Sequence, residues 1–336
     1  MIKYLGSKRL LIPRLLKKID EIGGLTTAAD LFSGTSRVGH ALKNHGIRCV
    51  ANDHNVYAHT LARCYVEADA DRVRDEAIKL LSELMLAPEV DGWFTENYCR
   101  QSRFFKPENG RKIEGIRTKI QALELDPALE AISLVSLMEA ADRVDSTTGV
   151  QMAYLKSWAP RAHNPLELRL PSILPGPGRA MNLDVIDAAR EIEADLVYLD
   201  PPYNQHSYLG NYHVWETLVR WDAPEIYGVA CKRVDCRDPA RKSAFNSKRK
   251  IEATMRELVA TVRARHLIVS FNNEGFLGRE LLESMLGARG TVSCDVVDYK
   301  RYVGAKIGVY NPSGEKVGVP THFRNREFLF HVTVDR

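Results

Sequence analysis

Apolar residues follow two patterns along this chain, short continuous runs and longer stretches with helical spacing. Residues 27–32 and 47–52 are short apolar runs of the kind that form buried strands. Between them, residues 37–44 have the spacing of a helix, and residues 7–22 carry leucines and isoleucines at helical intervals. A strand, a helix and a second strand in this order predict a βαβ unit, the start of a doubly wound parallel sheet.

The pattern changes in the middle of the chain, where helical and polar segments dominate. Ile113, Ile116 and Ile120 form an apolar stripe, and an irregular stretch rich in aromatic and basic residues precedes them. Strand patterns return in four later segments, at residues 194–199, 266–271, 291–302 and 326–334. We therefore expect an α/β sheet built from residues 1–67 and 166–336, interrupted by a helical insertion, residues 68–165.

Composition narrows the class of protein but does not dictate a partner. The 336 residues are 45% hydrophobic and 27% charged, with a net charge of +4, as in an ordinary soluble globular protein. No stretch is apolar enough for a membrane span, and the six cysteines are scattered without metal-ligand spacing. We expect a cytoplasmic protein with reduced thiols and no metal site.

The segment around Asp200 carries the first chemical signal. An apolar run, residues 196–199, ends in Asp200, Pro201, Pro202 and Tyr203. Prolines donate no backbone hydrogen bond, so the strand stops there and presents Asp200 and Tyr203 on a stiff turn. Ligands bind at the carboxyl ends of strands in open α/β sheets, and an acidic acceptor beside a flat ring suits a nucleobase. The alternative is that the prolines only terminate a strand.

Three further motifs precede this turn, and their order along the chain is informative. They are Tyr4-Leu5-Gly6-Ser7-Lys8, Asp30-Leu31-Phe32-Ser33-Gly34-Thr35-Ser36 and Asn52-Asp53. Together with the motif that begins at Asp200, they resemble the adenine-specific DNA methyltransferases of the D12, or Dam-like, class. The resemblance implies a Rossmann-like sheet that binds S-adenosylmethionine, and it implies that the helical insertion is a target-recognition region.

The resemblance also implies which residues hold the cofactor. A turn of small residues at a helix amino end lets backbone N–H groups approach a ligand, although Ser36 stands where the family usually has a second glycine. Asp53 would accept the ribose hydroxyls, and Asp184 the adenine amino group, but either carboxylate could instead cap a helix. The implied cofactor residues are Tyr4, Lys8, Asp30, Phe32, Ser33, Gly34, Thr35, Asp53, Asp184, Val185 and Asp200.

The implied reaction is methyl transfer to N6 of a flipped-out adenine. This nitrogen is a poor nucleophile, because its lone pair is delocalised into the ring. Asp200 and the Pro201 carbonyl would accept its hydrogens as positive charge develops, and Tyr203 would stack on the base. We expect a site-specific enzyme that acts on double-stranded DNA, either in a restriction–modification system with a cognate restriction endonuclease or as a solitary or phage-borne counterpart. Methylation of RNA adenine and a catalytically inactive DNA-binding relative are the alternatives.

Two basic segments, residues 98–119 and 232–250, are candidates for contacts with DNA phosphates, although charged runs are usually solvated surfaces. The second segment follows the catalytic turn, within reach of the backbone of a flipped nucleotide. The candidate DNA contacts are Arg103, Lys106, Lys232, Arg233, Lys248, Arg249 and Lys250.

Overall fold

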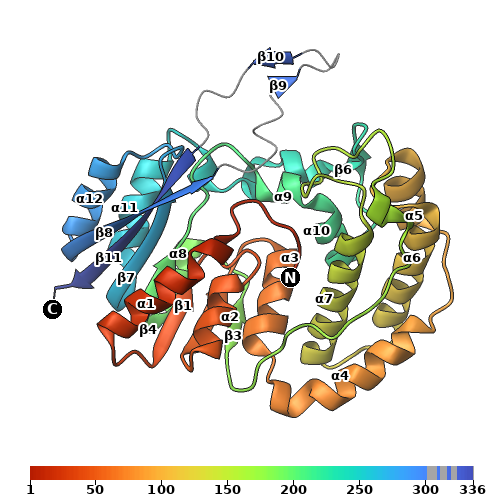
Figure 1. The fold of residues 1–336 in the computed structure, drawn as a ribbon, viewed down its shortest axis with the longest axis horizontal. Coiled ribbons are helices and arrows are strands. Elements are labelled where there is room, and N and C mark those ends of the chain that lie inside the picture. Colours follow the sequence, from red (N-terminus) through yellow and green to blue (C-terminus); the bar gives the residue numbers. More distant parts are fainter. Residues whose placement is uncertain (301–308, 311–315, 319–323, 336) are drawn as a thin grey trace.

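A seven-stranded sheet forms the centre of the protein within the residues that the computed structural model describes, which are 1–300, 309–310, 316–318 and 324–335 (Figure 1). In sheet order the strands are β3 (Arg179–Met181), β2 (Arg48–Asn52), β1 (Thr27–Asp30), β4 (Glu193–Leu199), β7 (Arg263–Asn272), β11 (Arg324–Val334) and β8 (Gly290–Lys300). Neighbouring strands are parallel, except that β11 runs antiparallel to both β7 and β8. The sheet grows from β1 in both directions, so the strand order reverses between β1 and β4.

Helices cover both faces of the sheet, and each face has its own hydrophobic core. The covering helices are α1 (Ile12–Ile22) and α2 (Arg37–Asn44) on one face, and α8 (Val185–Glu191), α11 (Ile251–Thr261) and α12 (Arg279–Gly287) on the other. Along β4, Tyr198 joins the first core and Leu199 the second. Burial on both faces explains why the sequence of this strand is almost continuously apolar.

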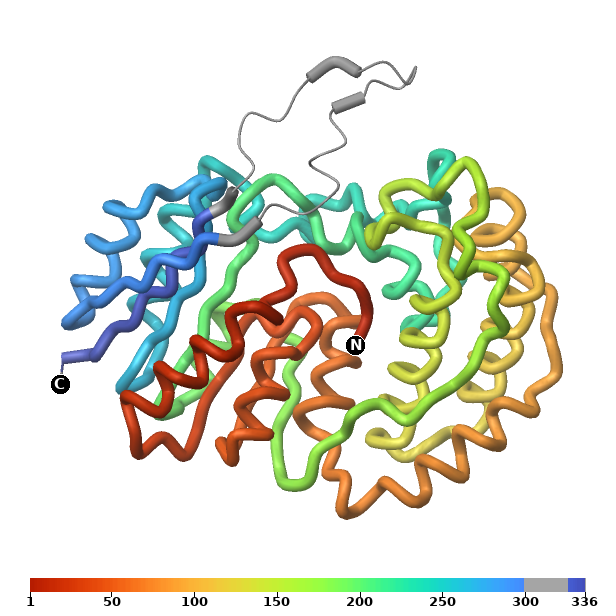
Figure 2. Tube along the Cα trace, viewed as in Figure 1, coloured from red at the N-terminus to blue at the C-terminus, as the bar shows by residue number. Residues whose placement is uncertain are grey.

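A helical region extends from the sheet at the end of the molecule away from the C terminus (Figure 2). Its elements are α3 (Val56–Ala62), η2 (Arg63–Glu67), α4 (Ala70–Met85), α5 (Trp93–Thr95), η3 (Glu96–Gln101), α6 (Pro107–Ala122), α7 (Pro127–Val144), η4 (Pro160–His163), α9 (Tyr208–Asn211) and α10 (His213–Arg220). One hydrophobic core, which includes Tyr57, Tyr98 and Trp215, joins the inserted helices to α3 and α10. The insertion therefore shares its core with elements that precede and follow it in the chain.

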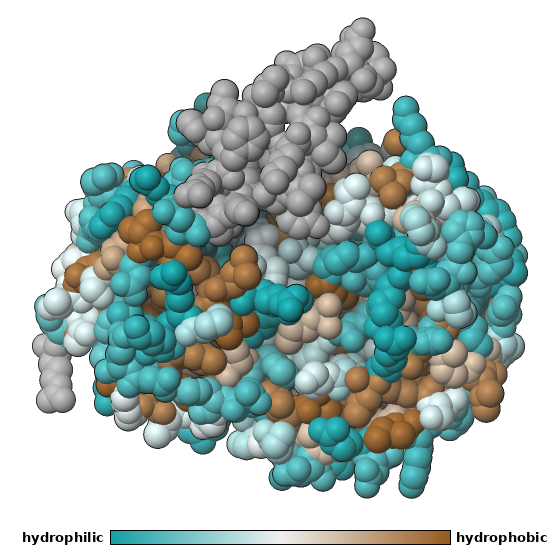
Figure 3. All heavy atoms as spheres, in the orientation of Figure 1, coloured by the Kyte–Doolittle hydropathy of each residue, from teal (hydrophilic) through white to brown (hydrophobic). Residues whose placement is uncertain are grey.

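Short elements complete the described part of the fold. They are η1 (Lys8–Leu10), β5 (Ile226–Tyr227), β6 (Lys232–Arg233), η5 (Val234–Arg237), η6 (Pro239–Arg241), η7 (Ala244–Asn246), β9 (Val309–Tyr310) and β10 (Lys316–Gly318). Hydrophilic residues cover much of the helical end on the face drawn in Figure 3. Among the described helices, none has both the length and the apolar composition needed to cross a bilayer.

The predicted α/β class is confirmed, and so are most of the predicted elements. The helix expected at residues 37–44 has those bounds, and the strands expected at 27–32, 47–52, 194–199 and 266–271 all occur within three residues of the predicted ends. The two closing segments form β8 and β11, although Tyr302, the predicted end of the first, lies outside the described residues.

Two local predictions differ from the structure. The single helix expected at residues 7–22 is wrong, because η1 ends at Leu10 and α1 starts afresh at Ile12. Pro13 stands in the first turn of α1, where its missing N–H costs nothing, but it could not continue a helix from further back. The sequence also did not predict β3, because a strand of three residues is too short to show a pattern.

Candidate active site

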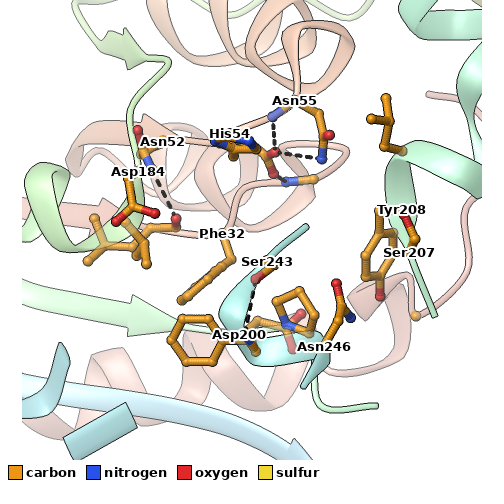
Figure 4. A pocket seen from close by; sticks show the side chains of 18 of the residues that line it. Phe32, Asn52, His54, Asn55, Asp184, Asp200, Ser207, Tyr208, Ser243 and Asn246 are labelled. Carbon is orange, nitrogen blue, oxygen red and sulfur yellow. Dashed lines mark hydrogen bonds between the residues drawn. The ribbon is translucent and has the colours of Figure 1, made fainter. Parts of the chain in front are cut away.

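A cavity of about 260 Å³ opens at the carboxyl ends of β1 and β4, where the strand order reverses. Figure 4 shows Asp184 and Asn52 on one side of it, and Ser207 and Tyr208 on the other. The predicted site residues that line it are Tyr4, Lys8, Phe32, Gly34, Thr35, Asp53, Asp184, Val185, Asp200 and Pro202. The remaining predicted site residues belong to the same turns but do not line the cavity: Asp30, Ser33, Pro201 and Tyr203.

The turn after β1 requires an unusual backbone. Gly34 has φ of +49°, and a Cβ atom there would lie 3.2 Å from the ring of Tyr4. Glycine is therefore favoured both by the backbone conformation and by the limited space. Ser36 is also left-handed, with φ of 58°, at the position where a second glycine was expected from the family. Such a conformation costs a residue other than glycine about 1–2 kcal/mol, so the chain tolerates strain in this turn.

Two predicted cofactor residues also act as local hydrogen-bond acceptors. Asp53 accepts from Gly34 N at 2.9 Å and from Asn55 N at 2.9 Å, which ties the turn after β1 to the turn after β2. Asp184 caps α8 by accepting from Ile186 N at 2.9 Å. The capping alternative is thus observed for Asp184. Both side chains also line the cavity, and a carboxylate has lone pairs for further donors.

A buried carboxylate lies behind this lining. Asp30 is buried at the end of β1, and its Oδ1 has no hydrogen-bond partner among the described residues; the same holds for Ser33 Oγ. Burial, followed by the negative charge of Asp200, raises the pKa of Asp30 to about 8. Buried polar atoms are nearly always paired, so these two atoms are candidates to meet a ligand.

Asp200 is paired with a buried lysine. Lys8 is 8% exposed, and its Nζ lies 3.0 Å from Asp200 Oδ1 and 2.5 Å from Oε1 of Glu327 on β11. Burial raises the pKa of Asp200 to about 6, although the charge of Lys8 opposes that rise. Sequence reasoning missed Glu327. The available signal was one acidic residue directly before the apolar run Phe328-Leu329-Phe330 of a predicted strand.

Tyr203, the ring expected to stack on the target base, is not among the residues that line the cavity. The Tyr203 ring packs against Phe271, with centroids 5.4 Å apart. Tyr208, five positions later, does line the cavity and stacks on Tyr4 with centroids 5.2 Å apart. Tyr4 in turn stacks on Tyr212 at 4.6 Å. Nothing in the sequence singled out Tyr208, because its exposure depends on how α9 returns to the cavity.

A loop formed by residues 240–246 lines part of the cavity. It belongs to the second predicted basic segment, but its place in the cavity was not predicted. Arg241 donates to Oε1 of the fully buried Glu216 at 2.7 Å, which fixes the start of the loop on α10. Asn246 donates to Asn204 O at 2.7 Å, which fixes its end on the turn after Tyr203. The exposed segment that follows, residues 248–250, is thereby held near the cavity.

The predicted DNA contacts fall into three groups. Arg233 is 1% exposed, and its guanidinium pairs with Asp222 at 2.7 Å and Asp235 at 3.0 Å. It cannot reach a phosphate in this arrangement, so we remove it from the candidates. Lys106 lies near His163, Arg103 lies over the Trp158 ring, and Lys232 contacts Met152. By contrast, the exposed residues Lys248, Arg249 and Lys250 form no ion pairs within the described chain.

Most of the first basic segment has structural roles. Arg117 is buried and donates to Leu218 O at 2.8 Å and Val219 O at 3.1 Å, which joins α6 to the end of α10. Arg100 and Arg111 are paired with nearby carboxylates. Phe104 and Phe105, in the same segment, belong to the hydrophobic core.

Comparison with known proteins gives independent information. The model of the D12 class N6 adenine-specific DNA methyltransferase family matches residues 4–276 of this chain. The chain is 29% identical over 327 residues to the modification methylase StsI of Streptococcus sanguinis. This alignment covers 91% of this chain and 50% of that protein. It is 27% identical over 324 residues to the type II methyltransferase M.FokI of Planomicrobium okeanokoites, with 90% and 50% covered. For the type II methyltransferase M.NlaIII of Neisseria lactamica, the identity is 28% over 341 residues, with 97% and 100% covered. The chain thus spans about half the length of the first two relatives.

The raised pKa of Asp30 predicts a pH dependence of stability. The folded protein keeps a proton on this carboxyl up to about pH 8, whereas the unfolded chain releases it near pH 4. The stability that this proton contributes is complete below about pH 4 and is lost as the pH rises through 8.

Asp30→Asn cannot ionise, so its free energy of unfolding should fall less than that of the wild type between about pH 5 and 8. Denaturant titrations at several pH values measure this difference. Asp187→Asn, on the exposed face of α8, is the control. If the free energy of unfolding changed equally with pH in the wild type and in Asp30→Asn, the prediction would be contradicted.

Proposed function

Because this chain belongs to the D12 class N6 adenine-specific DNA methyltransferase family, we propose that it methylates N6 of adenine at specific sites in double-stranded DNA. The observation that carries the proposal is the position of Asp200. It follows β4 beside the point where the strand order reverses, and it lines the cavity together with residues of the other three motifs. Four short segments of the chain thus converge on one cavity.

S-adenosylmethionine is the proposed methyl donor, and when bound it supplies an electrophilic methyl group on a positively charged sulfur. The residues present fit such a ligand. Carboxylates of Asp53, Asp184 and Asp200 line the cavity, and the unpartnered Asp30 Oδ1 and Ser33 Oγ lie behind it. These oxygen atoms are hydrogen-bond acceptors for the hydroxyl and amino groups of such a ligand, and the hydroxyl of Ser33 is also a donor. We propose that Asp53 accepts from the ribose and Asp184 from the adenine amino group, while Tyr4 and Lys8 close the site.

Asp200 is the proposed acceptor for the amino group of the target adenine. With a pKa of about 6 the carboxyl is mostly ionised at neutral pH, so it can accept a hydrogen bond from N6–H. That hydrogen bond strengthens as nitrogen commits its lone pair to the new N–C bond and becomes positive. One N6 proton must then leave, and Asp200 is the proposed base that takes it. The Pro201 carbonyl is the proposed second acceptor.

The target base must leave the duplex and find a stacking surface. Tyr203 remains the proposed ring by resemblance to the family, and Tyr208 is a second candidate because it lines the cavity. Stacking returns about 1–3 kcal/mol per base, which offsets part of the cost of flipping.

DNA contacts are proposed for Lys248, Arg249 and Lys250, together with Arg103, Lys106 and Lys232. The support for the first three is their exposure next to the loop that lines part of the cavity. We further propose that the helical insertion helps to recognise the target sequence and that a cognate restriction endonuclease accompanies the protein. Support for the second point is the naming of the relatives as modification methylases and type II methyltransferases.

The proposed function is tested by transfer of labelled methyl groups from S-adenosylmethionine. The protein is incubated with duplex DNA or with RNA of mixed sequence, and the nucleosides are separated after digestion. We expect label in N6-methyladenine from duplex DNA at a defined sequence. Label in RNA alone would replace the proposal with RNA methylation, and absence of transfer to either would leave an inactive DNA-binding relative.

Neutralising the exposed basic segment should weaken DNA binding at every sequence. Lys248→Gln, Arg249→Gln and Lys250→Gln together should lower the slope of log affinity against log salt by roughly one unit for each phosphate that the protein no longer neutralises. A matched control neutralises Arg72, Arg74 and Lys79 on α4, which lies away from α9 in Figure 1. Fluorescence anisotropy at several salt concentrations measures both slopes. If the two triple variants give the wild-type slope, the segment is only a solvated surface.

A further inference from the structure

A row of polar side chains crosses three adjacent strands beside the cavity. Asp200 follows β4, Ser270 lies on β7, and Glu327 lies near the start of β11. Residues two positions away, Tyr198, Ile268 and Leu329, belong to the core on the face covered by α1. Because side chains alternate along a strand, all three polar residues lie on that same face. Lys8, from η1, covers the row.

The contacts within this row are short and buried. Glu327 is 2% exposed and accepts from Ser270 Oγ at 2.6 Å through the same Oε1 atom that lies 2.5 Å from Lys8 Nζ. The same ammonium lies 3.0 Å from Asp200 Oδ1. One cation is therefore shared between two carboxylates, and the shorter distance is to the carboxylate that does not line the cavity.

Glu327 draws part of the lysine charge away from Asp200. In a region shielded from water, a second carboxylate beside one lysine competes with Asp200 for the ammonium. A Lys8–Asp200 pair without this second contact would make Asp200 a weaker acceptor. Asp200 is the group that the proposed reaction needs as an acceptor, so the extra carboxylate has a chemical use.

We propose that Glu327 is a positioning residue for methyl transfer. It anchors the Lys8 ammonium at Oδ1 of Asp200, so that Oδ2 faces the amino group of the target base. By taking a share of the lysine charge, it also keeps Asp200 a strong hydrogen-bond acceptor. This inference rests on the proposed function and extends it to a residue outside the four motifs.

The charges around Asp200 give the direction of the expected effect. Burial and the charge of Glu327 raise the pKa of Asp200, and Lys8 lowers it. Removing the charge of Glu327 therefore lowers the pKa of Asp200, whereas removing that of Lys8 raises it. The titratable or charged groups that interact with Asp200 from the surrounding elements are Lys8, Asp30, Tyr198, Tyr203, Tyr208 and Glu327.

The test compares Glu327→Gln, which keeps the shape and the acceptor for Ser270, with Glu327→Asp, which keeps the charge. Asp295→Asn, an exposed carboxylate on β8 of the same sheet, is the control. Single-turnover methyl transfer to duplex DNA is measured against pH. For Glu327→Gln we expect the acidic limb of the profile to move down by about one pH unit. The rate on the plateau should fall on the order of 10-fold, because Asp200 is a weaker and less well oriented acceptor.

A second measurement does not depend on activity. In protein labelled with ¹³C at aspartate carboxyls, the Asp200 signal is assigned by its disappearance in Asp200→Asn and is titrated without cofactor or DNA. Glu327→Gln should shift this titration to lower pH and Lys8→Met to higher pH, while Glu327→Asp and Asp295→Asn leave it close to the wild type.

The outcomes separate this inference from the proposed function. If the wild type transfers no methyl group to DNA, the proposed function fails, and the carboxyl titration still tests the charge coupling. If the wild type is active but folded Glu327→Gln keeps both its plateau rate and its acidic limb, Glu327 has no positioning role. A shift of the Asp200 titration in Glu327→Asp as large as that in Glu327→Gln would also overturn the inference, because the charge would then not be its cause.

Discussion

The two ion pairs of the buried Lys8 connect three segments that are distant in the sequence and meet beside the cavity. Lys8 joins the amino-terminal segment to Asp200 after β4 and to Glu327 on β11. The opposite charges stabilise one another in the interior, and removing one partner of such a buried pair typically costs about 3–5 kcal/mol. The same contacts fix the group that we propose to accept the N6 hydrogens. Stability and chemistry therefore depend on the same atoms.

The topology of the sheet explains why several carboxyl groups lie close together beside the cavity. Parallel strands bring their carboxyl ends to one edge, and the reversal of strand order opens a crevice there. Asp30 ends β1, and Asp53 and Asp200 follow β2 and β4, so the three carboxyl groups lie near one another. The pKa of Asp30 rises to about 8 and that of Asp200 to about 6, largely because both are buried. Burial of such groups lowers the stability of the folded state, a cost that is common where side chains are arranged for function.

The sequence predicted features that depend on one residue or a short motif, and it did not predict features that depend on contacts between distant residues. The turns at Gly34 and Asp200 were predictable, because glycine and proline have specific backbone preferences whatever surrounds them. Glu327 and Tyr208 were not, because their importance comes from residues that are distant in sequence and meet only in the folded sheet. Arg233 was misjudged for the same reason. Its charge suggested a phosphate contact, but Asp222 and Asp235 occupy it in the interior.

The most direct test of the account is the rate of methyl transfer by Asp200→Ala in a single turnover, with saturating S-adenosylmethionine and duplex DNA. Tyr203→Phe, which keeps the ring, is the matched control, and circular dichroism with DNA binding verifies that both variants are folded. Removal of one preorganised acceptor predicts a loss of about 10²–10³ in rate for Asp200→Ala, with the control within a few-fold of the wild type. A folded Asp200→Ala protein that transfers methyl groups within a few-fold of the wild-type rate would contradict the assignment of the active site.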